Sequence, residues 1–226
     1  MNNFYIVATP IGNLEDITLR ALRIMKEVDL ILAEDTRVTK KLLDKYEIET
    51  PLQRFDAKVE AKNFDKTINL LKEGKNIALV SDAGTPGIND PGSFIVSIVR
   101  KNLPEVKITP IPGPSALTTF LSVAGLKNTE FTFLGFLPHK KGRETIFKEI
   151  SELKRTTIFY ESPHRILKAL GSLDEFLTDE RNIIVARELT KIYEEIISGS
   201  AKELLEHFKS NKEKQKGEFV VIVEEK

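Results

Sequence analysis

The 226-residue sequence contains no cysteine, no tryptophan and only three histidines, at positions 139, 164 and 207. Without cysteine there is no disulfide, no thiolate-bound zinc, no iron–sulfur cluster and no cysteine nucleophile. The histidines are too far apart in the sequence for a local metal motif, so we expect no metal site. The net charge is zero, balanced on both sides of Gly113. The chain therefore lacks the overall positive charge of nucleic-acid-binding proteins, so any contact with RNA needs a local basic patch.

Long apolar runs are also absent. No stretch approaches the roughly 20 residues that span a membrane. The N-terminal segment MNNFYIVATPIGN has no basic region of the kind that opens a signal peptide. We therefore expect a soluble, cytoplasmic protein with no membrane partner. With 41% hydrophobic residues, the chain can bury one large or two small cores.

Short apolar runs alternate with helical patterns, which predicts an α/β fold with a mostly parallel sheet in the first half. Strands are predicted there at residues 4–8, 30–33, 52–55, 77–80 and 106–111, and the helices between them include 16–28 and 59–73. In the second half, strands are predicted at residues 131–137, 157–160, 183–188, 195–198 and 219–223, with only three helices between them. Two consecutive strands around Thr190 imply antiparallel pairing, hence a mixed sheet. We expect two lobes, residues 1–113 and 114–226.

None of the 12 glycines forms a G-x-G pair, so the dinucleotide-binding fingerprint is absent. The P-loop, G-x-S-x-G and H-E-x-x-H motifs are absent too. Instead, loops rich in glycine and proline follow three strands, at residues 9–13, 81–92 and 112–115. Ligands of open α/β sheets bind at the carboxyl ends of strands, and glycine lets the backbone approach them closely. One such loop is typical of an ordinary turn, but three at one edge indicate a ligand site.

Polar residues also follow several predicted strands. They are Glu34, Asp35 and Arg37 after the second strand, Asp82 after the fourth, Glu161, His164 and Arg165 after residues 157–160, and Arg187, Glu188 and Lys191 at the end of the strand predicted at residues 183–188. Simpler roles stay open: Asp35 could cap the next helix and Asp82 a turn. Arg187, Glu188 and Lys191 could form a structural salt bridge.

A basic cluster at His139, Lys140, Lys141 and Arg143 follows the strand predicted at residues 131–137, with Phe136 close by for base stacking. This cluster is either a local RNA-binding patch or a solvated loop.

Residues 81–92, SDAGTPGINDPG, resemble the signature of the bacterial 16S ribosomal RNA cytidine 2′-O-methyltransferases, which belong to the tetrapyrrole-methylase superfamily. Six further segments agree in order and spacing: ATPIGNLEDITLRAL, AEDTR, PIPGPSAL, GFLPHKKGR, FYESPHR and ARELTKIYEE. The resemblance implies two α/β lobes, the first with a mostly parallel sheet and the second with a mixed sheet, with S-adenosylmethionine (AdoMet) in a cleft between them. It also implies a homodimer that methylates the ribose 2′-hydroxyl of a cytidine in the decoding region of 16S rRNA.

The resemblance also implies site residues. The cofactor contacts of related members match Pro10, Asp82, Ala83, Gly84, Thr85, Ser115, Ala116, Tyr160, Ala186 and Arg187, and more weakly Gly217. The residues that we expect to bind RNA are Glu34, Arg37, Lys140, Lys141, Arg143, His164 and Arg165. A base that removes the hydroxyl proton would be a carboxylate at a strand end, and the leading candidates are Asp35 and Glu161, with Glu34 beside them.

Two other functions stay open. A methylase of a tetrapyrrole carbon would share the fold and the cofactor, but AEDTR, FYESPHR and PHKKGR argue against it. A catalytically inactive ribosome-binding protein is the alternative from another class. Calorimetry with AdoMet separates the inactive protein from both enzymes, because an inactive module should not bind the cofactor.

Overall fold

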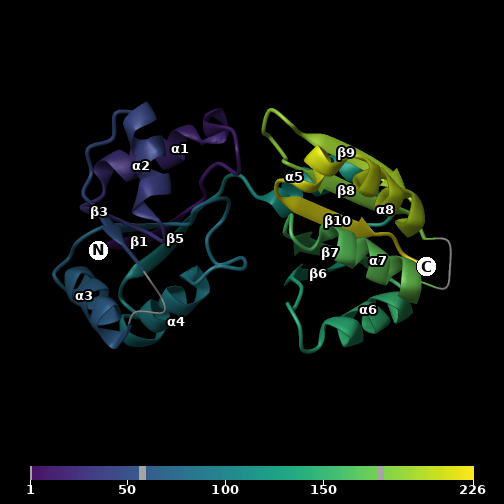
Figure 1. Cartoon of the computed structure of the whole chain (residues 1–226). Coiled ribbons are helices and arrows are strands. Elements are labelled where there is room, and N and C mark those ends of the chain that lie inside the picture. The colour runs from purple at the N-terminus through teal and green to yellow at the C-terminus, as the bar shows by residue number, and fades with distance from the viewer. Residues whose placement is uncertain (1, 56–59, 178–180) are drawn as a thin grey trace. The chain divides into compact units, whose positions relative to one another are not determined.

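The computed structural model describes residues 2–55, 60–177 and 181–226. The chain divides into two compact units, one ending at Ser115 and the other beginning at Ala116 (Figure 1). The sequence placed this boundary after Gly113. The start of the helix predicted at residues 59–73 lies outside the described residues.

The first unit is built on a five-stranded parallel sheet in the order β3-β2-β4-β1-β5. Its strands are β1 (Asn3–Val7), β2 (Leu30–Ala33), β3 (Leu52–Arg54), β4 (Ile77–Val80) and β5 (Lys107–Ile111). Val7 at the end of β1 pairs with both Val80 and Ile111, the last residues of β4 and β5. Because all strands run the same way, the segments that follow them emerge at one edge of the sheet.

Helices cover both faces of this sheet (Figure 1). They are α1 (Leu19–Glu27), α2 (Thr36–Lys45), α3 (Glu60–Lys72) and α4 (Gly92–Asn102). Residues of α1 and α2 share one hydrophobic cluster with Val7, and residues of α3 and α4 share another with Phe4. Two cores, one on each face, are what a doubly wound parallel sheet requires.

The helix predicted at residues 16–28 is in fact two elements, a short 3₁₀ turn η1 (Leu14–Asp16) and α1. Asn13 caps the turn by accepting a hydrogen bond from the Glu15 amide, and Thr18 caps α1 through the Ala21 amide. Ile17 between them is extended. The two caps therefore divide a pattern that the apolar spacing predicted as one helix.

The second unit has a mixed sheet in the order β6-β7-β10-β8-β9. Its strands are β6 (Phe131–Phe136), β7 (Thr156–Glu161), β8 (Ile183–Arg187), β9 (Glu195–Gly199) and β10 (Phe219–Val223). β6 and β7 are parallel, and the other pairs are antiparallel. The predicted antiparallel pair around Thr190 is confirmed by β8 and β9.

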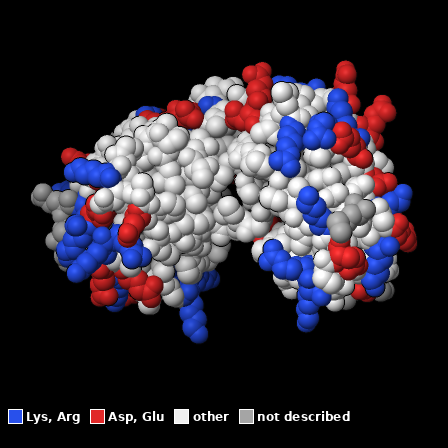
Figure 2. All heavy atoms as spheres, turned by 180° about the vertical axis from the view of Figure 1, so that it is seen from behind, with Lys and Arg blue, Asp and Glu red and all other residues white. Residues whose placement is uncertain are grey.

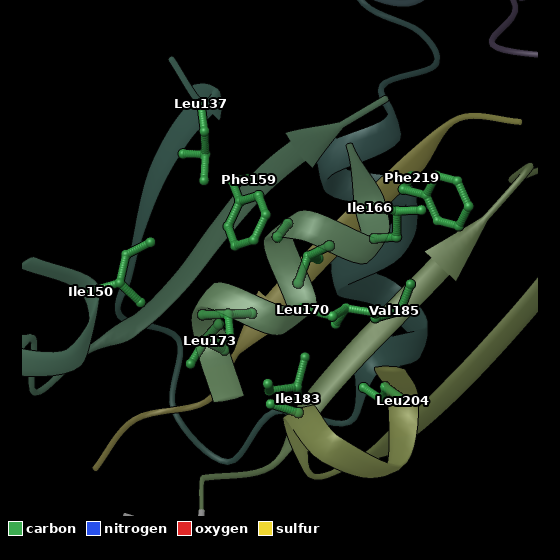
Figure 3. Packing of buried hydrophobic residues seen from close by; sticks show 14 of the residues in the cluster. Leu137, Ile150, Phe159, Ile166, Leu170, Leu173, Ile183, Val185, Leu204 and Phe219 are labelled. Atoms are coloured by element: carbon green, nitrogen blue, oxygen red, sulfur yellow. The ribbon is translucent and has the colours of Figure 1, made fainter. Parts of the chain in front are cut away.

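The helices of the second unit are α5 (Ala116–Ala124), α6 (Arg143–Glu152), α7 (Ile166–Phe176) and α8 (Ala201–Ser210), followed by the 3₁₀ turn η2 (Lys212–Gln215). Phe159 of β7, Val185 of β8 and Phe219 of β10 belong to one buried cluster with Leu170 of α7 and Leu204 of α8, and Figure 3 shows Phe219 beside Ile166 of α7. Burying each such side chain contributes about 1.5–3 kcal/mol. This core fixes the sheet edge that carries the polar strand ends.

Where charged side chains occur on the face shown in Figure 2, those of opposite sign lie close to one another, in keeping with the zero net charge, and a broad area of this face carries neither sign. Within the described ranges, every helix falls short of the length and hydrophobicity that a bilayer-spanning segment needs.

Candidate functional site

Three loops meet at the edge of the first sheet. The Thr9 amide donates to the Gly84 carbonyl at 2.9 Å, and the Gly84 amide donates back at 3.0 Å. The Thr85 hydroxyl donates to the Pro114 carbonyl at 3.1 Å. The predicted convergence of the three glycine- and proline-rich loops is therefore confirmed.

Gly84 occupies the centre of this meeting point with φ of +80°. A Cβ atom there would lie 3.4 Å from Cγ2 of Ile11 and 3.7 Å from the carbonyl oxygen of Pro114. Only glycine adopts this backbone conformation without strain, and any longer side chain would occupy the space between the loops.

The remainder of residues 81–92 is shaped by its own polar side chains. Asp90 accepts hydrogen bonds from the amides of Gly87 and Gly92, with distances between 2.6 and 2.9 Å. The Ser81 hydroxyl donates to the Gly84 carbonyl at 3.1 Å, and Thr9 Oγ1 donates to the Ser81 carbonyl at 3.0 Å. Much of the signature motif thus holds the loop in shape.

Asp35, a candidate base, caps α2 by accepting the Arg37 amide at 2.9 Å. The Arg37 guanidinium also binds both of its carboxylate oxygens, with Nη2 at 2.6 Å from Oδ2. These side-chain and backbone hydrogen bonds hold the pKa of Asp35 far below its usual range. Asp82 lies next to it, because Asp82 Oδ1 accepts the Asp35 amide at 2.9 Å. Asp35 therefore stays ionised and is a weak proton acceptor, and its capping role is confirmed.

The edge of the second sheet carries Phe136, Glu161 and Arg187, the last residues of β6, β7 and β8. The Glu161 side chain has no exposed surface and forms salt bridges with Arg143 at 2.8 Å and Arg165 at 2.7 Å. Both carboxylate oxygens are therefore held in salt bridges, and the side chain has no exposed surface at which it could take a proton from a substrate. Glu161 does not fit the role of base that we predicted for it.

Arg143 is likewise buried, with 5% of its surface exposed. The sequence grouped it with Lys140 and Lys141 as an RNA contact, but its guanidinium faces the interior. The polar residues that are exposed after β6 and β7 include His139, Lys140, Lys141 and His164.

Arg187 binds two neighbouring segments rather than a free surface. Its Nε donates to the Lys216 carbonyl at 2.7 Å, and Nη1 donates to the Tyr193 carbonyl at 3.0 Å. If Arg187 contacts the cofactor as predicted, only its backbone is available for that contact.

Glu188, which follows β8, accepts Lys191 Nζ and the Glu218 amide, each at 2.9 Å. Burial raises the pKa of Glu188, but these hydrogen bonds outweigh it and the pKa is lowered. The salt bridge that was open between Glu188 and Lys191 is confirmed. Gly217, at φ of +101°, has no room for a Cβ because the Glu188 side chain lies over it.

Tyr160 packs edge-to-face between two aromatic rings of β6, with its centroid 5.0 Å from that of Phe133 and 5.4 Å from that of Phe136. Ala186 is fully buried in β8, and Ser115 is buried at the end of the first unit. In the described parts of the chain, no three histidine, aspartate or glutamate side chains gather in a way that could hold a metal ion.

Comparison with known proteins agrees with these features. The family model of the tetrapyrrole (corrin/porphyrin) methylases matches residues 3–205. The chain belongs to this family.

Curated relatives narrow the position of the chain within the family. It is 46% identical over 223 residues to ribosomal RNA small subunit methyltransferase I of Thermotoga maritima, covering 99% of this chain and 98% of that protein. It is 48% identical over 221 residues to the protein of the same name from Escherichia coli O157:H7, covering 97% of this chain and 77% of that one. The resemblance drawn from seven sequence segments is thereby confirmed.

Solved structures confirm the fold. The methyltransferase CobJ matches with a TM-score of 0.71 at 20% identity, over 100% of this chain and 95% of that chain. Cobalt precorrin-4 methyltransferase CbiF matches with a TM-score of 0.68 at 16% identity, over 97% of this chain and 94% of that one.

Proposed function

We propose that this protein transfers a methyl group from AdoMet to the ribose 2′-hydroxyl of a cytidine in the decoding region of 16S rRNA. The observation that carries the proposal is the 46% identity to a small-subunit rRNA methyltransferase over 99% of this chain. Support comes also from the edge loops, because the first sheet brings together three of the segments that resemble the family, those that contain Thr9, Gly84 and Pro114.

The edge of the first sheet fits a cofactor such as AdoMet. Gly84 leaves a space between loops that a Cβ would begin to fill, and the backbone around it is held in place by Ser81 and Thr85. We assign cofactor contacts here to Pro10, Asp82, Ala83, Gly84, Thr85 and Ser115. When bound, AdoMet supplies an activated methyl group on a sulfonium, and this chemistry needs no metal ion.

Ala116, Tyr160, Ala186, Arg187 and Gly217 are proposed as further cofactor contacts, all in the second unit. Arg187 would contribute backbone atoms only, because its side chain is already hydrogen-bonded within the unit, and Gly217 has only backbone atoms to contribute.

Alignment of the ribose hydroxyl is the main task of the protein residues, since orientation is worth up to about 7–11 kcal/mol in favourable cases. Asp35 is better suited to orient Arg37 than to accept a proton, because Arg37 lowers its pKa. Arg37, whose side chain is 87% exposed, would then face a phosphate next to the target ribose. Glu34 lies beside this pair and is also exposed.

Lys140, Lys141 and His164 are the proposed RNA contacts of the second unit, because they are exposed at its sheet edge. The proposed substrate is 16S rRNA within the small ribosomal subunit, which puts the protein in the cytoplasm. We also propose a homodimer, supported by the exposed apolar side chains of Val123, Phe131 and Phe136 on the second unit.

Incubation of unmethylated small subunits with the protein and AdoMet, followed by mass spectrometry of the nucleosides, tests the proposal. We expect one 2′-O-methylcytidine, absent when AdoMet is left out. A methyl group on the base would contradict the proposed reaction. If the RNA stays unmodified and an added tetrapyrrole is methylated, the substrate is a tetrapyrrole and not 16S rRNA. If calorimetry shows no AdoMet binding, the protein is inactive. Light scattering that gives a monomer mass would contradict the dimer.

A further inference from the structure

A buried carboxylate lies at the centre of the second sheet edge. Glu161 Oε1 lies 2.7 Å from Arg165 Nε and accepts the Ser162 amide at 2.8 Å. Glu161 Oε2 accepts Arg143 Nη2 at 2.8 Å. The side chains of Arg143 and Arg165 are 6% and 13% exposed, so the group is almost closed to solvent.

Each arginine continues beyond the carboxylate to the backbone that follows β6. Arg143 Nη1 donates to the Pro138 carbonyl at 3.1 Å, and Arg165 Nη1 donates to the Leu137 carbonyl at 2.9 Å. Arg143 itself ends the same loop. The loop of residues 137–143 is thus held at its beginning and at its end by groups that share one carboxylate.

The residues between these two fixed ends are exposed. They include His139, Lys140 and Lys141, which the proposed function assigns to RNA. Lys140 also accepts the Arg143 amide through its carbonyl at 3.2 Å, which closes the loop into a turn. A short turn with both ends fixed can hold its lysines in one arrangement before RNA arrives.

Stability alone does not account for this cluster. Burying ion pairs costs desolvation that their attraction often fails to recover, and apolar residues of similar size are frequently as stable. The cost is increased here, because Arg143 Nε is buried without a hydrogen-bond partner. What the forked guanidinium groups provide is geometry, since each bridges a carboxylate and a carbonyl in fixed directions.

We propose that Glu161 is a positioning residue for the RNA substrate: through Arg143 and Arg165 it holds the loop of residues 137–143 so that Lys140 and Lys141 meet RNA phosphates. This inference rests on the proposed function, because the loop matters to catalysis only if it contacts RNA. It assigns no proton transfer to Glu161.

The test uses the full-length variants Glu161→Gln and Arg165→Met. Glu161→Gln would leave two buried guanidinium groups without a counter-charge. Arg165→Met keeps the Arg143–Glu161 pair and removes the Arg165 side of the cluster, which is its salt bridge to Glu161 and its hydrogen bonds to Ser162 and to the Leu137 carbonyl. Arg165→Met therefore keeps the test valid if Glu161→Gln fails to fold. Arg181→Met is the matched control, since Arg181 is a buried arginine of the same unit that donates to carbonyls of residues 150–153.

We expect faster amide hydrogen exchange in residues 137–142 of both test variants, with exchange in β8 unchanged. KM for small subunits should rise by up to about tenfold, because misplaced lysines can lose no more than the phosphate contacts that they make. The kcat at saturating subunits and the AdoMet affinity should stay close to wild type. Arg181→Met should lower the melting temperature and leave KM unchanged.

Unchanged KM in a folded test variant would overturn the inference while the wild-type activity upholds the proposed function. A rise in KM of the same size in Arg181→Met would overturn it as well, because general loosening would then explain the effect. If the wild-type protein fails to methylate small subunits, the proposed function is wrong and this inference falls with it.

Discussion

At the edge of the first sheet, loops are joined to one another through backbone groups and short hydroxyl side chains, as between Thr9 and Gly84. At the edge of the second sheet, buried charged side chains hold the loops, with Glu161 and Arg187 as the centres. Loops of the first kind leave room beside a glycine, and loops of the second kind present long exposed side chains from a fixed base. The first construction suits a small ligand that the backbone must approach, and the second suits a large charged partner.

The largest effect that tests this comparison is expected from a substitution of Gly84 at the first edge. Gly84→Leu should lower AdoMet affinity by about a hundredfold or more, equal to about 2.7 kcal/mol, because leucine fills the space between the loops and strains the positive φ. Gly74→Leu is the matched control, since Gly74 has φ of +87° and no atom near its missing Cβ. Calorimetry on both variants should show the loss in Gly84→Leu only. Equal affinities would mean that Gly84 has a structural role alone.

The next effect concerns the second edge. Gly217→Ala should lower the free energy of unfolding by about 2 kcal/mol or more, from strain at positive φ and from displacement of the Glu188 side chain. Gly125→Ala shares the positive φ but has open space, so it should cost the strain alone. Denaturant unfolding compares the two. Equal losses of unfolding free energy would show that the Glu188 side chain moves aside freely and that its hydrogen bonds to Lys191 and Glu218 contribute little to stability.

Much of the first edge could be predicted from the sequence, because three loops rich in glycine and proline follow strands of one parallel sheet, where a single such loop would indicate only a turn. Strand periodicity located β2, β4 and β10 with their observed bounds. Topology then brought the loops together without any knowledge of side-chain contacts. The sequence did not predict the division between η1 and α1, because it does not show whether the side chains of Asn13 and Thr18 adopt the rotamers that make capping hydrogen bonds.

The second edge could be predicted far less well. Glu161, Arg143 and Arg165 were each proposed to face the substrate, since charged residues at strand ends do so in many enzymes. Their pairing depends on the burial of all three side chains and on a contact between Arg143 and Glu161, which are 18 positions apart in the sequence. A sequence shows which residues are charged, but it does not show which of them the tertiary fold closes against one another.

A smaller effect is expected at the loop of residues 137–143. Lys140→Glu combined with Lys141→Glu should weaken RNA binding about tenfold at moderate salt and leave AdoMet affinity unchanged. Each lost phosphate contact to single-stranded RNA reduces the salt slope by about 0.7, so the slope should fall by about 1.4. Arg143 is left intact, because its guanidinium is buried.

The control for this pair is Lys101→Glu combined with Lys107→Glu. Both residues are exposed in the first unit, Lys101 in the last turn of α4 and Lys107 at the start of β5, away from the loops that follow the strands. The change in net charge is the same. If the control variant weakens RNA binding equally, only overall charge matters and the loop has no special role.

The smallest effect is expected from Asp35→Asn. A carboxylate whose pKa is lowered on folding stabilises the protein above its unfolded pKa, and this is lost only as pH falls through the folded pKa. Asp35 therefore remains ionised between about pH 6 and 9, where its usual pKa near 3.9 is already exceeded. If it orients Arg37, kcat should fall a few-fold in Asp35→Asn, by the same factor across that range. Asp44→Asn, which removes an exposed charge from the same helix, should leave kcat unchanged. Single-turnover methylation of small subunits at several pH values provides the measurement, and an acid limb in the wild type that disappears in Asp35→Asn would restore Asp35 as the base.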